Sequence, residues 1–176
     1  MNLSFSTASQ ADAKELAALH TAVAEDLTRR YGRGFWSFKT SEKGALLTLR
    51  HSRVLIARKG KTIVGTLNFP TKKPWAIDVS YFTPVEVPIY LTGMAVIPEM
   101  QRQGIGTRLM KEAVKQVRAW PADAIRLDAY DHSAGAGEFY AKCGFREIGH
   151  VIYRKGPLVY FELLVRRLPK RKSKPL

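Results

Sequence analysis

The chain has 176 residues, of which 45% are hydrophobic and 25% charged, so its length and composition suit one globular domain with its own core. Its basic residues outnumber its acidic ones to give a formal net charge of +14, and its only cysteine, Cys143, excludes an internal disulfide and a cysteine-based zinc cluster. The longest apolar runs are far shorter than a membrane span and the first residues lack the pattern of a secretion signal, so we expect a cytoplasmic protein that binds neither a membrane nor a metal ion.

The first 70 residues predict short strands and two helices. A variant capping box at residues 9–12, Ser-Gln-Ala-Asp, opens the first helix, and the glycines Gly32 and Gly34 end it. Ser41 caps a second, shorter helix. Strands are expected near residues 3–5, 54–57 and 62–69, the last two joined by a hairpin turn.

Residues 70–88 form a long segment with four prolines, a density that breaks regular structure. The segment also carries Trp75, Ile77, Tyr81 and Phe82, and this many apolar side chains argues against disorder. Long ordered loops in compact domains usually have a function. We therefore expect this segment to cover one side of a binding pocket.

The chain is organised around residues 89–119, which predict a strand, a turn and a helix. The strand is an apolar run between two prolines. The turn contains Gly104 and Gly106, which let a ligand come close to the backbone. The helix has an apolar stripe and leaves the N–H groups of its first turn unpaired at the positive end of its dipole. Together these features predict an anion site, most naturally for a pyrophosphate.

A short helix and three more strands complete the predicted order of elements. Ser133 is expected to cap the short helix, and Gly144 to end it as the glycine that follows the last helical residue. The strands are expected near residues 125–129, 147–153 and 158–165.

Three kinds of phosphate-binding turn compete for residues 101–106. A dinucleotide fold needs a third glycine where this chain has Leu109, and a nucleotide P-loop needs a lysine that this turn lacks. The pattern Gln101-x-x-Gly104-x-Gly106 after an apolar strand instead resembles the coenzyme A pyrophosphate loop of the GNAT superfamily of N-acetyltransferases. Taken alone, the turn is also compatible with a plain glycine-rich connection between a strand and a helix.

A second block of residues makes the resemblance specific. GNAT proteins commonly carry, downstream of the loop, a Tyr on a short helix followed by Gly-Phe, and this chain has Tyr140, Gly144 and Phe145. The family often has Asn at the position of Ser133, where a hydroxyl could still bind the pantetheine arm of coenzyme A. The order of elements also matches, so the resemblance covers nearly the whole chain.

The resemblance implies an α/β fold of the GNAT acyl-CoA N-acyltransferase type, with a mixed, mostly antiparallel central sheet flanked by helices and with splayed central strands. It implies a single domain over residues 1–166, followed by a basic tail at 167–176 that we expect to be disordered. The cosubstrate is then acetyl-CoA. The residues expected to hold it are Met94, Ala95, Val96, Gln101, Arg102, Gln103, Gly104, Ile105, Gly106, Thr107, Ser133 and Tyr140.

Acetyl transfer to an amine needs a neutral amine, a polarised thioester carbonyl and a proton for the departing thiolate. By resemblance, backbone groups of residues 94–96 hold the thioester, and Tyr140 protonates the sulfur as the general acid. The central strand can do this because it splays from its neighbour and leaves its edge groups unpaired.

The general base stays open among several residues. Asp128 is the carboxylate on a predicted strand, whereas Asp78 and Glu86 lie in the segment expected to cover the pocket. Tyr90 or Thr92 on the central strand could instead orient a water molecule.

Aromatic and acidic side chains could form an acceptor pocket for a cationic amine, because a cation is attracted to the faces of aromatic rings. The residues expected to line it are Trp36, Trp75, Asp78, Tyr81, Phe82 and Glu86. A small amine, a peptide N-terminus or a lysine side chain would each suit such a pocket.

The sequence therefore predicts an N-acetyltransferase that moves an acetyl group directly from acetyl-CoA to an amine acceptor in a ternary complex. The rival from another class is a catalytically silent module that binds CoA or RNA on the same fold. Much of the positive charge lies in the tail and on the outer face of the helix at 105–118, without interleaved aromatic residues, so we expect no nucleic-acid partner. A homodimer is compatible with the sequence.

Overall fold

The structure of the chain is a computed structural model that describes residues 2–166, so the predicted basic tail at 167–176 lies outside the described residues. The helices are α1 (Ala13–Tyr31), α2 (Glu42–His51), α3 (Ile105–Arg118) and α4 (Gly137–Lys142). The strands are β1 (Ser4–Thr7), β2 (Ser52–Lys59), β3 (Thr62–Pro70), β4 (Pro88–Tyr90), β5 (Thr92–Val96), β6 (Ala124–Tyr130), β7 (Arg146–Tyr153) and β8 (Gly156–Leu164). No helix among residues 2–166 combines the length and the apolar character needed to cross a membrane.

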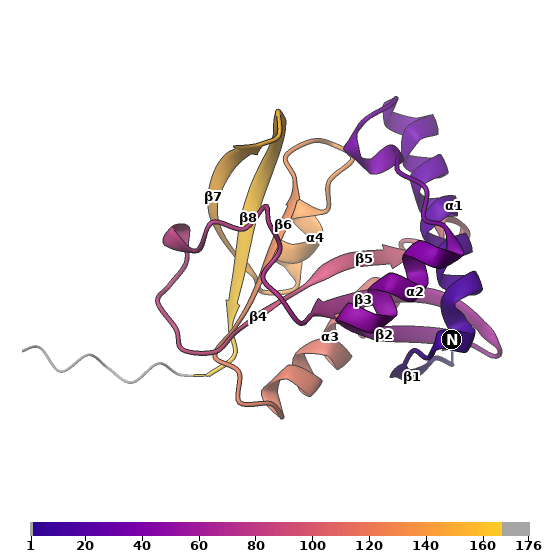
Figure 1. Cartoon of the computed structure of the whole chain (residues 1–176), viewed down its shortest axis with the longest axis horizontal. Coiled ribbons are helices and arrows are strands. Elements are labelled where there is room, and N and C mark those ends of the chain that lie inside the picture. Colours follow the sequence, from indigo (N-terminus) through magenta and orange to yellow (C-terminus); the bar gives the residue numbers. More distant parts are fainter. Residues whose placement is uncertain (1, 167–176) are drawn as a thin grey trace, which may run out of the picture.

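The strands form two four-stranded sheets that lie side by side (Figure 1). The first has the order β1-β2-β3-β5 and is antiparallel throughout. The second has the order β4-β6-β8-β7, and only its β4–β6 pair is parallel. Helices flank the sheets, and the predicted fold class, a mixed and mostly antiparallel α/β fold, is confirmed.

Alternating side chains of β2 separate two hydrophobic cores, since successive residues of a strand point to opposite faces. Val54 and Ile56 pack with α1 and α2, whereas Leu55 and Ala57 pack in the core that contains α3 and α4. α1 and α2 therefore cover one face of the first sheet and α3 covers the other, whereas α4 packs against β7 of the second sheet. This arrangement puts the first turn of α3 on one side of the sheet and α1 on the other.

Two helix starts follow the capping signals of the sequence. The Ser9 N–H donates to the Asp12 carboxylate at 2.8 Å, as a capping box requires. The Ser41 hydroxyl accepts a hydrogen bond of 3.1 Å from the Gly44 N–H at the start of α2. Each of these bonds satisfies a backbone N–H that the helix itself leaves unpaired.

The predicted helix cap at Ser133 is wrong, because α4 begins only at Gly137. Residues 132–135 first form a tight turn, in which the Gly135 N–H donates to the His132 carbonyl at 2.7 Å. A Cβ at position 135 would stand 1.9 Å from the Tyr130 carbonyl oxygen, so only glycine fits. The chain thus uses this turn to leave β6 before the helix can start.

The proline-rich segment at 71–87 is ordered and lies against the second sheet, where its apolar side chains are in contact with β8. Ile77 and Phe82 form a buried cluster with Tyr160. The Tyr160 hydroxyl donates to the Ala76 carbonyl and accepts the Asp78 N–H at 3.0 Å. These contacts explain how a segment with little regular structure keeps a fixed path.

Candidate active site

The two sheets part between β5 and β6. The chain passes from β4 in the second sheet to β5 in the first, and Tyr90 is the last residue of this passage that pairs with β6, opposite Arg126. The Leu91 N–H still donates to the Arg126 carbonyl at 2.9 Å. Beyond that point β5 pairs with β3 and β6 with β8, and the two strands diverge (Figure 1). Among the described residues, the facing edges of β5 and β6 have no strand between them, so their backbone groups can bind a ligand.

The turn before α3 presents backbone N–H groups to open space. Gly104 caps the helix with a φ of 80°, and a Cβ added there would meet no atom within 4 Å. The Arg108 N–H makes the first helical bond, to the Gly104 carbonyl at 3.1 Å. The N–H groups of residues 105–107 therefore lack an acceptor in the preceding turn of the helix. Since these donors lie at the positive end of α3, the turn suits an anion.

The two glutamines of this turn support its shape through their side chains. The Gln101 amide donates to the Val96 carbonyl at 3.0 Å, and the Gln103 amide donates to the Glu99 carbonyl at 3.2 Å. At Gly106 glycine is favoured by packing, because a Cβ there would lie 3.3 Å from the Met94 methyl group. The backbone, more than these side chains, is thus the part of the turn that faces a ligand.

Tyr140 lies in the core between α4 and the second sheet, among the rings of Phe139, Phe145 and Phe161. Every fully buried polar side-chain atom of the described residues has a hydrogen-bond partner. The Tyr140 hydroxyl has none among those residues, so it must reach solvent-accessible space. Burial, followed by the nearby Asp128 charge, raises the pKa of Tyr140 above its ordinary value. The phenol therefore keeps its proton at neutral pH.

Asp128 lies on β6 just beyond the point where the two sheets part, and it pairs directly with Tyr160 of β8. Burial raises the pKa of its carboxyl group, while its own backbone N–H opposes that shift. The Asp128 charge in turn helps to raise the pKa values of Tyr130, Tyr140 and Tyr160, after burial as the main cause. Asp128 is therefore a partly buried carboxylate among three tyrosines.

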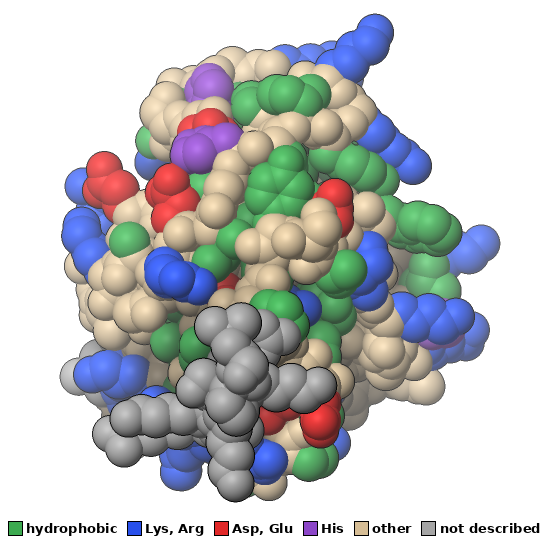
Figure 2. Space-filling view, turned by 90° about the vertical axis from the view of Figure 1, so that its left-hand side faces the viewer, with side chains coloured by type: hydrophobic (Ala, Val, Ile, Leu, Met, Phe, Trp, Pro, Cys, Tyr) green, Lys and Arg blue, Asp and Glu red, His purple; other side chains and the backbone are tan. Residues whose placement is uncertain are grey.

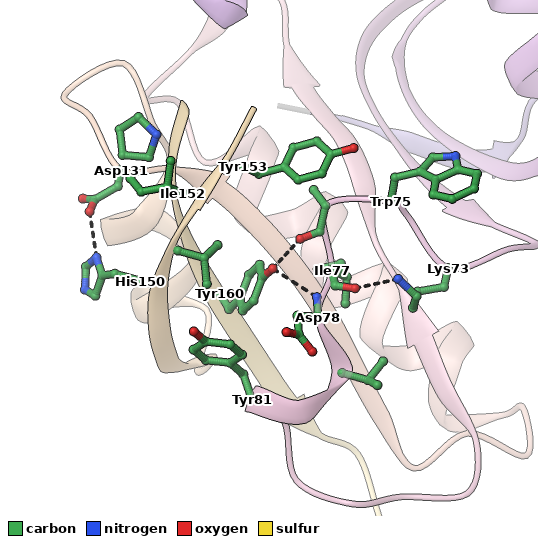
Figure 3. Close-up of a pocket in the computed structure, with 14 residues that line it drawn as sticks. Lys73, Trp75, Ile77, Asp78, Tyr81, Asp131, His150, Ile152, Tyr153 and Tyr160 are labelled. Atoms are coloured by element: carbon green, nitrogen blue, oxygen red, sulfur yellow. Dashed lines mark hydrogen bonds and ion pairs between the residues drawn. The ribbon is translucent and has the colours of Figure 1, made fainter. Parts of the chain in front are cut away.

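A pocket of about 750 Å³ lies between the 71–87 segment and the hairpin of β7 and β8 (Figure 3). Trp75, Asp78 and Tyr81 line it, as the sequence predicted for an acceptor pocket. Tyr160 lines it too, which connects the pocket to Asp128 across one pair of strands. Figure 2 shows this face of the molecule, where hydrophobic side chains gather in the middle and acidic side chains lie beside them.

The other three residues predicted for the acceptor pocket lie elsewhere. Phe82 is 5% exposed and packs beneath the pocket against Tyr160. Trp36 stacks on His132 with ring centroids 4.7 Å apart, at the end of β6. Glu86 is exposed outside the pocket lining. Proximity in sequence therefore did not predict which side chains of the loop share the pocket.

Several pocket residues were missed because they are far apart in the sequence. His150 of β7 binds the Asp131 carboxylate at 2.7 Å and the Glu147 carboxylate at 2.9 Å. These two bonds, that to Asp131 first, raise the pKa of His150. The Lys73 ammonium group donates to the Ile77 carbonyl at 2.6 Å. In the sequence, His150 is a polar residue in a predicted strand where polar and apolar residues alternate. That pattern is too common to indicate a site.

The residues predicted for the cosubstrate fall into two groups along one path. Those of β5 and of the turn before α3 lie next to each other, since the Gln101 amide donates to the Val96 carbonyl. Ile105 is buried, so only its backbone can meet a ligand. Ser133 is exposed in the turn that precedes α4. The structure thus brings β5 and the turn together, and Phe139, the neighbour of Tyr140, lies 3.3 Å from the position of a Cβ on Gly106.

Comparisons with known proteins agree with this geometry. A sequence model of the acetyltransferase (GNAT) family matches residues 18–145. No protein with a curated description matches the chain in sequence. The family match covers most of the chain and both blocks of residues on which the resemblance was based.

Solved structures share the fold at low sequence identity. An N-acetyltransferase from Staphylococcus aureus Mu50 has a TM-score of 0.70 and 13% identity, over 94% of this chain and 100% of that one. A putative acetyltransferase from Salmonella typhimurium, solved with acetyl-CoA, has a TM-score of 0.69 and 13% identity, over 98% and 99%. The ribosomal-protein-S18-alanine N-acetyltransferase from Escherichia coli has a TM-score of 0.69 and 16% identity, over 97% and 98%.

Proposed function

This chain belongs to the acetyltransferase (GNAT) family, and from that premise we propose that it transfers an acetyl group from acetyl-CoA directly to an amine. One observation carries the proposal: β5 leaves an open edge where the two sheets part, next to the turn whose α3 N–H groups are unpaired. The Tyr140 hydroxyl, which has no hydrogen-bond partner among the described residues, supports it. A structural neighbour from Salmonella typhimurium was solved with acetyl-CoA, which supports the same donor here.

Acetyl-CoA, when bound, supplies the acetyl group as a thioester. The chain fits it, because the open space beside Gly104 and the N–H groups of residues 105–107 suit the charge of a pyrophosphate. The free edge of β5 at residues 94–96 offers backbone donors and acceptors to the amides of the pantetheine arm. Ser133, exposed in the turn before α4, would add a hydroxyl for the pantetheine arm.

Two side chains would divide the proton transfers. Asp128 takes the proton that the amine must lose, and its raised pKa brings it nearer to the basicity that a general base needs. Tyr140 donates a proton to the departing sulfur. For this its hydroxyl has to be protonated and free of a hydrogen bond to another residue of the described chain. The net result is that one proton passes from the amine nitrogen to the thiol while the acetyl group passes the other way.

The pocket of about 750 Å³ would hold the acceptor. Asp78 stays ionised, because its bonds to the Ser80 backbone and hydroxyl lower its pKa. Asp131 adds a second carboxylate on the far wall, and Trp75 and Tyr81 add aromatic faces. Lys73 and His150 line the same pocket and offset these two carboxylates. The aromatic faces of Trp75 and Tyr81 would therefore be the main attraction for the cationic form of the acceptor amine, before it loses its proton.

A screen of thiol release tests the proposal. The full chain is incubated with acetyl-CoA and a panel of amines and peptides, and free thiol is measured against a control without acceptor. Acceptor-dependent release supports the enzyme. Calorimetric binding of CoA without release for any acceptor would instead favour the silent module, and a salt-sensitive gel shift with RNA would indicate a nucleic-acid partner.

A further inference from the structure

A second, smaller pocket lies on the other side of the first sheet from α3. It has a volume of about 230 Å³ and is enclosed by α1, α2 and the strands beneath them, including Leu16, His20, Thr48, Asn68 and Gly93. This volume is below that of a drug-sized ligand site but larger than a single water needs. It therefore suits a group of a few non-hydrogen atoms.

Asn68 of β3 gives this pocket an unpartnered polar group. The residue is 8% exposed, and no hydrogen bond within the described residues satisfies its side-chain amide. Since every fully buried polar side-chain atom of those residues is bonded, the Asn68 amide must reach accessible space. The pocket that Asn68 lines is that space.

Gly93 is what allows Asn68 to occupy this place. A Cβ on residue 93 would stand 2.3 Å from the Asn68 amide nitrogen, so any other residue would displace the side chain. Gly93 also has a φ of 60°, at the point where the pairing of β3 with β5 shifts register. The irregular backbone of β5 at Gly93 thus leaves room for the Asn68 side-chain amide to lie directly against β5.

His20 of α1 is the only titratable side chain among the residues that line this pocket. Burial lowers its pKa, so the imidazole is neutral at pH 7. A neutral imidazole presents one donor and one acceptor, and the Asn68 amide presents both as well. Because burying a charge without a partner is costly, this pocket favours an uncharged group that can both donate and accept hydrogen bonds.

The pocket also lies beside the reaction path. Gly93 precedes Met94, the first of the three residues expected to hold the thioester, and it follows the split between the sheets by two residues. We propose that the second pocket binds a carboxamide group of the acceptor, such as a peptide bond, through Asn68 and His20. The inference rests on the proposed acetyl transfer and defines its acceptor as an amine that also carries an amide.

The test compares two amines of similar size and basicity, 4-aminobutanamide and pentylamine, in the thiol-release assay. Wild-type protein should use the amide about tenfold more efficiently in kcat/KM, the size expected from one or two neutral hydrogen bonds. Asn68→Leu keeps the side-chain volume but should bring this ratio close to one. Thr66→Val is the matched control on the same strand and should keep the ratio, because Thr66 lies outside the pocket lining and its hydroxyl donates to the Leu55 carbonyl at 3.1 Å.

A binding measurement separates the inference from the proposed function. In the presence of CoA, 4-aminobutanamide should shift the NMR signals of the Asn68 side-chain amide, and pentylamine should not. Turnover of both amines at equal efficiency would overturn the inference and leave the acetyltransferase intact. If no amine releases thiol, the proposed function fails, and the Asn68 signals alone then decide whether the pocket binds an amide. Should Asn68→Leu fail to fold, His20→Phe replaces it with the same expected loss of the ratio.

Discussion

Arg126 and Glu162 form an ion pair of 3.1 Å between β6 and β8, with side chains that are 4% and 1% exposed. The pair also holds the segment at 71–87 in place. The Thr83 hydroxyl donates to the second Glu162 oxygen at 2.6 Å, and the Arg126 guanidinium donates to the Thr83 carbonyl. One wall of the larger pocket is therefore fixed by a buried charge pair whose arginine lies on the same strand as Asp128.

Replacing Arg126 with Met should lower the free energy of unfolding by about 3–5 kcal/mol, because Glu162 is left charged and buried without its partner. Urea denaturation measures this loss. Arg146→Met is the matched control, since Arg146 approaches the same carboxylate at 3.6 Å but is 69% exposed, and about 1 kcal/mol or less is expected. Equal losses for the two variants would contradict the assignment of the buried pair as the anchor.

Replacing Gly104 with Val should weaken CoA binding at least tenfold, about 1.4 kcal/mol, because the new side chain enters the open space beside the N–H groups of α3. Calorimetry with CoA measures the effect. Gly60→Val imposes a comparable backbone strain at a φ of 61° in the turn between β2 and β3, far from α3. It should destabilise the fold to a similar extent but leave CoA binding unchanged. Unchanged binding in a folded Gly104 variant would exclude the pyrophosphate assignment.

Most helices, strands and turns of the fold could be predicted from the sequence, because the signals for them lie within a few residues of one another. The Ser9 box and the Ser41 cap each depend on a bond between residues three apart, so their chemistry is visible in a short window. The turn at Gly104 was predicted for the same reason. The central strand was predicted as one element, but it divides at Leu91, because its two halves pair with different neighbours. Such a division depends on partners that lie far along the chain.

The pockets were harder to predict, because they depend on pairs that are distant in sequence. The larger pocket joins Asp78 to Tyr160, and the smaller one joins His20 to Asn68 and Gly93. His20 and Asn68 each look like an isolated polar residue in an apolar pattern. Only the approach of β3 to β5, and the glycine that makes room for the amide, brings them to one cavity.

Asp128→Asn should increase stability at neutral pH while it lowers turnover. A raised carboxyl pKa means that the folded chain binds the proton more tightly than the unfolded chain does. The stabilising effect of protonation is therefore present below the ordinary value of 3.8 and is lost as the pH rises through the raised pKa. Above that window the charge destabilises the fold, and Asn removes it.

Urea denaturation at several pH values checks this sign. The variant should be more stable than the wild type at pH 7, and the difference should shrink as the pH falls toward 3.8. Turnover should drop by about 10²–10⁴, the usual contribution of a general base. A stable variant with wild-type turnover would remove Asp128 as the base and leave Asp78, Glu86 or a water oriented by Tyr90 or Thr92 as the alternatives.

Tyr140→Phe tests the proposed general acid with little change in packing. The ring keeps its contacts with Phe139, Phe145 and Phe161, and the lost hydroxyl has no hydrogen bond among the described residues, so the fold should survive. General acid catalysis contributes roughly 10²–10⁴ in rate, and kcat should fall within or near that range. Affinity for acetyl-CoA should change much less, because the backbone of β5 and the first turn of α3 are unaltered.

The split between kcat and binding distinguishes the roles that Tyr140 could have. Tyr130→Phe is the matched control, since it removes a phenol whose pKa is raised by burial and by the same Asp128 charge, but from β6 and not from α4. If only Tyr140→Phe lowers kcat, the donor role is supported. Loss of acetyl-CoA binding in Tyr140→Phe would mean that Tyr140 has a structural role in the cosubstrate site and not a catalytic one. Wild-type kcat would mean that water or another residue protonates the sulfur.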